Sequence, residues 1–139
     1  MGELLLRKVL LCRDRIEKIR RALPVPPESI ADDENKEAFV AFHLFLLVQD
    51  ALDLAAHIIA ERGLAIPASQ RESFMVLTGA GLIAKETAAG MVQMASLRNR
   101  IAHTYSELDP VRMAREAPLG LEAVSRFLDE LVLGTTPPG

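Results

Sequence analysis

The chain has 139 residues, and half of them are apolar although only 4% are aromatic. A chain of this length is the size of one domain and can bury enough apolar surface to fold without a disulfide or a metal. The single cysteine, Cys12, excludes an internal disulfide framework. A formal net charge of −3 argues against a protein that coats nucleic acid by bulk charge, but it leaves room for a local basic site.

No segment has the pattern of an export signal or a membrane anchor. Glu3 precedes the short apolar run near the N-terminus and cations follow it, which reverses the order found in a secretory signal. A myristoylation motif at Gly2 would need serine or threonine where the chain has Leu6. The longest apolar stretch, residues 39–48, is shorter than the roughly 20 residues of a bilayer span. We therefore expect a cytoplasmic protein without a membrane partner.

Proline, aspartate and glycine bound the first two predicted helices. Aliphatic residues recur at helical spacing over residues 4–23, and this helix should stop at the proline-rich segment 24–27. Asp32 or Asp33 then caps a long second helix, which runs to Arg62 and is followed by a glycine suited to a left-handed cap.

The second helix is apolar on more than one side. One stripe recurs at alternating steps of four and three, and the opposite side carries further apolar residues. Several neighbours bury a helix of this kind, so we expect it at the centre of a bundle or partly in a subunit interface. The stripe consists of Ala38, Phe42, Phe45, Gln49, Leu52, Ala56 and Ile59, and the opposite side includes Phe39, Leu46, Val48 and Ile58.

The remaining chain predicts further helices. A capping box at residues 69–72 starts a third helix, which Gly79 and Gly81 break after about two turns. A fourth helix starts near Leu82 and continues through Ile101.

The last helix should begin at Asp109-Pro110, with aspartate as the cap and proline in the first turn. We expect it to be interrupted at residues 118–120 and to end before Gly134. No stretch alternates long enough to form a strand. The sequence therefore predicts an all-α, up-and-down bundle of four or five helices, with a single domain over residues 1–134 and a disordered tail over residues 135–139.

Four polar side chains follow one another closely near the end of the fourth helix, after about four turns of largely apolar sequence. They are Arg98, Asn99, Arg100 and His103. Arg98 occupies a position that the helical pattern reserves for packing, and a half-buried guanidinium needs an anion or hydrogen-bond acceptors. This conflict between pattern and residue type identifies a candidate site.

The chemistry available to these residues is narrow. Histidine transfers protons near neutral pH, arginine holds a phosphate, and asparagine can orient either group. Together they suit attack of an RNA 2′-hydroxyl on its own phosphate, which needs no metal. Arg98 and His103 lie about 140° apart around the helix, so two copies related by a twofold axis would be needed to bring both residue types into one cleft. Simple nucleotide or phosphate binding is the alternative.

Plainer interpretations exist for each candidate. Arg98 could form a structural ion pair with Asp50 or Asp53, and both carboxylates could equally support a functional arginine. His103 could stabilise the C-terminus of its helix, and Tyr105 could be a rim residue that exposes its hydroxyl. Histidine and aspartate also recur at metal-compatible spacings in the second helix, but a site would need converging ligands from other helices. We therefore expect no metal and no cofactor.

The motif resembles the Arg-x4-His-x-Tyr motif of HepT toxins, which belong to the HEPN superfamily of all-helical ribonucleases. The resemblance covers roughly residues 34–133. It rests on Arg98, Asn99, His103, Thr104 and Tyr105, and on residues 49–55, 57–63, the Ile66-Pro67 loop with Ser69, and residues 91–105.

This resemblance implies a homodimeric helical bundle whose motifs line a shared cleft and cleave RNA. It assigns Arg98 and His103 as catalytic and Asn99 as their support, with Arg100 as a further cation for RNA phosphates. It also implies an MntA-like nucleotidyltransferase antitoxin that transfers AMP from ATP onto Tyr105, so that ATP serves only the partner. The alternative is a catalytically silent helical module that binds this partner or is modified by it.

Overall fold

A computed structural model describes residues 1–135 of the chain, and these residues form helices without a strand. The elements are α1 (Glu3–Ala22), the short 3-10 helix η1 (Pro27–Asp32), α2 (Glu34–Glu61), α3 (Gln70–Gly79), α4 (Lys85–Thr104), the 3-10 turn η2 (Tyr105–Glu107) and α5 (Pro110–Thr135). The predicted all-α fold is confirmed. Of the predicted tail, Thr135 is instead the last residue of α5, and the other four residues lie outside the described part.

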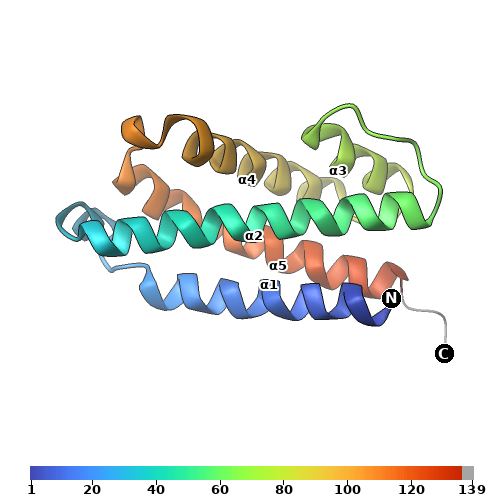
Figure 1. The fold of residues 1–139 in the computed structure, drawn as a ribbon, viewed down its shortest axis with the longest axis horizontal. Helices are drawn as coiled ribbons and strands as arrows, with labels where there is room; N and C mark the ends of the chain where they lie inside the picture. Colours follow the sequence, from blue (N-terminus) through green and yellow to red (C-terminus); the bar gives the residue numbers. More distant parts are fainter. Residues whose placement is uncertain (136–139) are drawn as a thin grey trace.

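Four long helices run up and down along the same axis, and α3 is a short addition at one end (Figure 1). The α1–α2 and α4–α5 pairs form the most extensive contacts, and α2 also packs against α3, α4 and α5. Helix α2 therefore contacts every other α-helix of the bundle, as one of the two positions predicted for it requires. The polar residues at the end of α4 pack against this helix.

Local chemistry explains the helix boundaries. The Asp33 carboxylate accepts a hydrogen bond from the Lys36 amide at 3.0 Å and begins α2, and Gly63 ends it with a φ of 62°. Ser69 accepts from the Glu72 amide at 3.1 Å at the start of α3. In a departure from the ideal capping box, the Glu72 carboxylate accepts from the backbone of Ala68 rather than from that of Ser69.

Three predicted helix limits are wrong. Helix α4 begins at Lys85, three residues later than expected, and Leu82 and Ile83 are buried in the bend that precedes it. Helix α5 ends at Thr135 rather than before Gly134. Helix α5 is continuous through Pro118, although proline removes one backbone hydrogen bond. The helix continues there because the residues before and after the proline, such as Ala117 and Leu121, are buried against the bundle, whereas Pro118 faces solvent.

The core contains aliphatic residues from all five α-helices, together with Phe74 and Phe127, whose rings meet edge to face at 5.7 Å. Cys12 is fully buried, and burial raises the pKa of its thiol to about 12. This agrees with its interpretation as a small apolar residue. Among the described residues, α2 has the length and hydropathy of a membrane span, but one side of it packs into this core.

The stripe seen in the sequence of α2 is not its buried face. Apart from Ile59, every residue of the stripe is exposed or half-buried, and Phe42 is 58% exposed. The buried face consists of Val40, Ala41, Leu44, Leu47, Val48, Ala51, Leu54, Ala55, Ile58 and Ile59. Helix α2 therefore has a core face and a second, outward apolar face.

Helices α4 and α5 approach closely at Gly90, where a Cβ atom would lie 2.6 Å from the Cβ of Ala123. We expect Gly90→Ala to lower the free energy of unfolding by about 1–2 kcal/mol, since overpacking at a rigid Ala–Ala contact outweighs the helix propensity gained. Thermal or urea unfolding followed by circular dichroism measures this change.

The matched control is Gly79→Ala in α3, where a Cβ atom would meet no heavy atom within 4 Å. In that variant the free energy of unfolding should rise by up to about 1 kcal/mol. Combining Gly90→Ala with Ala123→Gly should relieve the clash. Equal effects of Gly90→Ala and Gly79→Ala would contradict a close contact here.

Candidate functional site

Arg98 lies where the last turns of α4 cross the middle of α2, and its half-buried guanidinium is fixed from several sides. Its Nη2 donates to Oε1 of Gln49 in α2 at 2.8 Å, and its Nη1 donates to Oδ1 of Asn99 at 3.2 Å. The guanidinium carbon lies 4.7 Å from the centre of the Phe45 ring, within the range of a cation–π interaction. Neutral groups therefore hold this cation in place.

The ion pair considered for Arg98 in the sequence is wrong. Within the described part of the chain, no carboxylate oxygen lies within the 4.0 Å limit of a salt bridge to Arg98. Lys8 of α1 instead approaches Asp53 at 3.3 Å and Asp50 at 3.9 Å. The guanidinium charge consequently remains available to a ligand.

Gln49 is the residue that sequence reasoning missed as the partner of Arg98. Its Nε2 donates to Oδ1 of Asp53 at 3.3 Å while its Oε1 accepts from Arg98, so a polar chain links Arg98, Gln49, Asp53 and Lys8 across three helices. The signal was present, since Gln49 is the one polar residue in the outward stripe of α2.

Asn99 connects the site to α3. Its Nδ2 donates to Oε1 of Gln70 at 3.2 Å, and its Oδ1 accepts from Arg98. Asn99 therefore links the Arg98 guanidinium, through its amide oxygen, to α3, through its amide nitrogen, and its supporting role in catalysis stays a prediction.

His103 and Tyr105 lie beyond Arg98, at the end of α4 and in η2, and both are exposed. Tyr105 lines an apolar pocket of about 280 Å³ together with Phe42 and Phe45 of α2. Because Phe45 also lies under Arg98, this pocket borders the arginine site. Within one chain, the structure shows no contact between Arg98 and His103 among the described residues, as their separation around the helix predicts.

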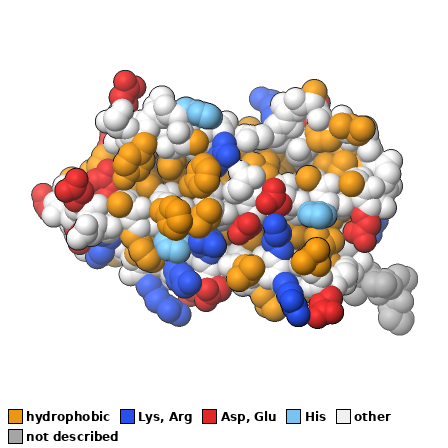
Figure 2. Space-filling view, viewed as in Figure 1, with side chains coloured by type: hydrophobic (Ala, Val, Ile, Leu, Met, Phe, Trp, Pro, Cys, Tyr) orange, Lys and Arg blue, Asp and Glu red, His pale blue; other side chains and the backbone are white. Residues whose placement is uncertain are grey.

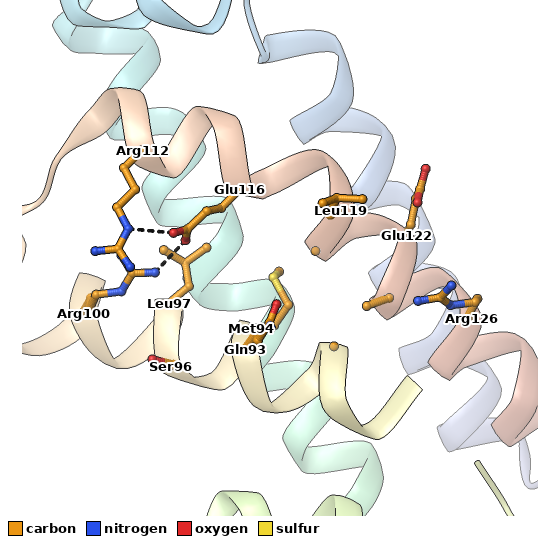
Figure 3. A pocket seen from close by; sticks show the side chains of 13 residues that line it. Gln93, Met94, Ser96, Leu97, Arg100, Arg112, Glu116, Leu119, Glu122 and Arg126 are labelled. Atoms are coloured by element: carbon orange, nitrogen blue, oxygen red, sulfur yellow. Dashed lines mark hydrogen bonds and ion pairs between the residues drawn. The ribbon is translucent and has the colours of Figure 1, made fainter. Parts of the chain in front are cut away.

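Arg100 faces a different side of α4 from Arg98. It lines a groove of about 520 Å³ between α4 and α5 and bonds the Glu116 carboxylate at 2.7 Å, as does Arg112 (Figure 3). Burial raises the pKa of Glu116, but the hydrogen bonds from the two arginines outweigh it, so the net pKa lies below its ordinary value. The structure thus does not bring Arg100 together with the other motif residues.

The histidines of α2 do not gather metal ligands. The ring centroids of His43 and Phe39 lie 4.2 Å apart, with the rings tilted by 50°. His43 Nδ1 accepts a hydrogen bond from Arg15 at 2.8 Å. His57 is exposed farther along the helix. Burial and the neighbouring cations Arg15 and Lys18 lower the pKa of His43. In the described part of the chain, no group of three or more His, Cys, Asp and Glu residues is placed to hold a metal.

The outward face of α2 has a distinct pattern. In the view of Figure 2, apolar side chains lie on both sides of a charged middle. On α2 itself, the exposed rings of Phe39 and Phe42 lie in the N-terminal half. Asp50 and Asp53, with Lys8 of α1 beside them, lie near the middle. The exposed residues of its last turns are Ala56, His57, Ala60 and Glu61. Arg98 and Gln49 meet beside this polar centre.

Known proteins are similar to this chain in sequence and in fold. A family model described as "Ribonuclease HepT-like" matches residues 12–131. The mRNA nuclease HepT of Shewanella oneidensis is 26% identical over 129 residues, which are 93% of this chain and 96% of that protein.

Solved structures agree in fold. The tri-AMPylated HEPN toxin of Shewanella oneidensis, in complex with MNT antitoxin, has a TM-score of 0.86 at 25% identity, covering 96% of this chain and 99% of that chain. A toxin–antitoxin structure with AMP-PNP has a TM-score of 0.84 at 24% identity, covering 94% and 99%. The predicted resemblance is therefore confirmed, and the chain belongs to the HepT-like ribonuclease family.

Proposed function

We propose that the protein is the toxin of a toxin–antitoxin pair, and that it is a metal-independent endoribonuclease that cleaves mRNA or tRNA as a homodimer. The observation that carries this proposal is the Arg98 guanidinium, which is held in place by neutral groups and keeps its charge available to a phosphate. The mRNA nuclease activity of the Shewanella relative supports the assignment.

The proposed reaction uses the RNA as its own nucleophile. An imidazole of His103 removes the proton from a ribose 2′-hydroxyl, whose oxygen then forms a bond to the adjacent phosphorus. The bond from phosphorus to the 5′-oxygen breaks, that oxygen takes a proton from water, and a 2′,3′-cyclic phosphate is left. Arg98 stabilises the negative charge that grows on the phosphate, and Asn99 keeps Arg98 in position. No step requires a metal or a cofactor.

The outward face of α2 supports a homodimer. A surface that exposes the rings of Phe39 and Phe42 beside a polar centre can pair with a copy of itself across a twofold axis, so that apolar side chains of the two chains meet. Such pairing would place Arg98 and His103 of both chains near one cleft, which one chain by itself does not provide. Arg100, paired with Glu116 in the α4–α5 groove, remains a prediction as a phosphate contact.

Inhibition is proposed to act through Tyr105. A nucleotidyltransferase partner would transfer AMP from ATP onto its hydroxyl, which adds bulk and negative charge beside the cleft and repels RNA. The 45% exposure of Tyr105 allows an enzyme to reach it, and the tri-AMPylated toxin among the structural relatives supports the same chemistry.

A second candidate function rests on this exposed tyrosine. The protein could be a helical interaction module that is modified by the nucleotidyltransferase and does not cleave RNA. An RNA-cleavage assay separates the two functions, because the second function predicts no cleavage even by unmodified protein.

The nuclease proposal predicts that Arg98→Ala and His103→Ala each reduce RNA cleavage by at least about 100-fold, because each removes a group that acts on the transition state. Purified proteins are incubated with tRNA and total RNA in EDTA, and the helical circular dichroism signal checks the fold. Lys85→Ala, which removes a cation at the exposed start of α4, is the matched control and should cut like the parent.

Mixing the two inactive variants tests the composite cleft. If one cleft takes Arg98 from one chain and His103 from the other, a mixed dimer contains one intact cleft and regains cleavage. Absence of any recovery would refute the composite cleft. If both single variants cut as well as the parent, the nuclease assignment itself is wrong.

The modification proposal predicts that intact-mass analysis after incubation with the partner enzyme and ATP shows additions of AMP. Tyr105→Phe should abolish them, since Tyr105 is the only tyrosine in the chain. Ser106→Ala, which removes the neighbouring hydroxyl, should still be labelled. Persistent labelling of Tyr105→Phe would place the acceptor elsewhere.

A further inference from the structure

We propose that Gln49 is a positioning residue that aims Arg98 while leaving its charge free for an RNA phosphate. We further propose that Lys8 keeps the neighbouring carboxylates from taking that charge. This inference rests on the proposed function, because it concerns how the same arginine is prepared for its ligand.

The argument starts from the chemistry of the contact. Gln49 accepts a hydrogen bond from Arg98 Nη2 at 2.8 Å, and the Phe45 ring lies 4.7 Å from the guanidinium carbon. A neutral amide oxygen orients the guanidinium without cancelling its charge. A carboxylate at the same place would form a charge-assisted, two-point pair that a phosphate would have to displace.

The remaining hydrogen-bonding capacity of Arg98 matches such a ligand. Each terminal nitrogen carries two hydrogens, and the contacts to Gln49 and Asn99 use one on each. One hydrogen on each terminal nitrogen is left for a phosphate. The third nitrogen, Nε, is buried and makes no hydrogen bond to the described residues, so the ligand must be taken by the terminal nitrogens.

Carboxylates lie close enough to interfere. Asp53 is one helical turn from Gln49, and Asp50 is adjacent to Gln49 in the sequence. The amide of Gln49 separates Asp53 from Arg98, since its nitrogen donates to Asp53 at 3.3 Å and its oxygen faces Arg98. If the Gln49 amide were flipped, its NH2 group would face the N–H groups of Arg98, and neither could accept a hydrogen bond. The hydrogen-bond network therefore determines the orientation of this amide.

Lys8 completes the separation of charges. Its ammonium group lies 3.3 Å from Asp53 and 3.9 Å from Asp50, on the side supplied by α1. Without Lys8, two carboxylates near the site would compete with a phosphate for Arg98 and repel it. A helix outside the motif therefore contributes to the electrostatics of the proposed cleft.

The first test measures binding of a single-stranded RNA that is 2′-O-methylated and so resists cleavage. Gln49→Glu should weaken binding about tenfold, and the salt dependence of log K should become shallower by about 0.7, the loss of one phosphate contact. Fluorescence anisotropy between about 50 mM and 200 mM salt measures both quantities. Ala89→Glu adds the same negative charge on the exposed first half of α4, away from both Arg98 and Arg100, and should stay within about twofold of the parent.

Two further variants separate the orientation of the Arg98 guanidinium from the charge of the groups around it. Gln49→Met removes the hydrogen bonds without adding charge, so it should lower kcat more than it raises KM for a cleavable RNA. Lys8→Met should weaken binding of the 2′-O-methyl RNA in the same direction as Gln49→Glu, whereas Lys85→Met at the exposed start of α4 should not. Circular dichroism confirms that each variant folds.

A double-variant cycle decides whether Gln49 acts through Arg98. If it does, Gln49→Glu has no further effect on binding once Arg98 is alanine. An equal effect in both backgrounds, or Gln49→Glu behaving like Ala89→Glu, overturns the inference. Failure of the proposed function looks different, because then the parent cuts no RNA and Arg98→Ala by itself leaves binding unchanged.

Discussion

A guanidinium that leaves bulk water must be met by other groups, and this requirement at Arg98 couples the site to the fold. Helix α2 supplies an amide oxygen and an aromatic ring, and α3 acts through the Gln70–Asn99 contact. Removing any one of these helices would leave a partly desolvated charge with fewer acceptors, at a cost of a few kcal/mol. The geometry of the site therefore depends on how α2, α3 and α4 pack against one another.

Helix α2 has two faces with different surroundings. Its inner face fills the core between α1, α4 and α5, while its outer face exposes aromatic rings in the N-terminal half and is polar at the centre. The exposure of rings such as Phe42 on this outer face is the observation behind the proposed dimer. The same face carries Gln49, and any seam formed there lies next to Arg98.

Local sequence rules succeeded wherever short-range chemistry decides. Asp33, Ser69 and Asp109 cap their helices as their side chains predict, and Gly63 takes the left-handed conformation that few other residues adopt. The same rules failed at Pro118, because burial of the surrounding turns holds α5 together despite the missing hydrogen bond. They also failed to identify the inner face of α2, because α2 has two apolar faces and periodicity does not show which of them is buried.

The sequence by itself determined the helical bundle, the principal caps and the unusual run of polar residues at the end of α4. Those features depend on residue type and on spacing within one segment. Only the tertiary structure decided the partner of Arg98, because Gln49, Asp50 and Asp53 lie on neighbouring positions of α2 and the choice depends on where α1 brings Lys8. It likewise placed Arg100 in another groove, opposite Glu116. Contacts between distant segments depend on how the helices are rotated against each other, which no single helix specifies.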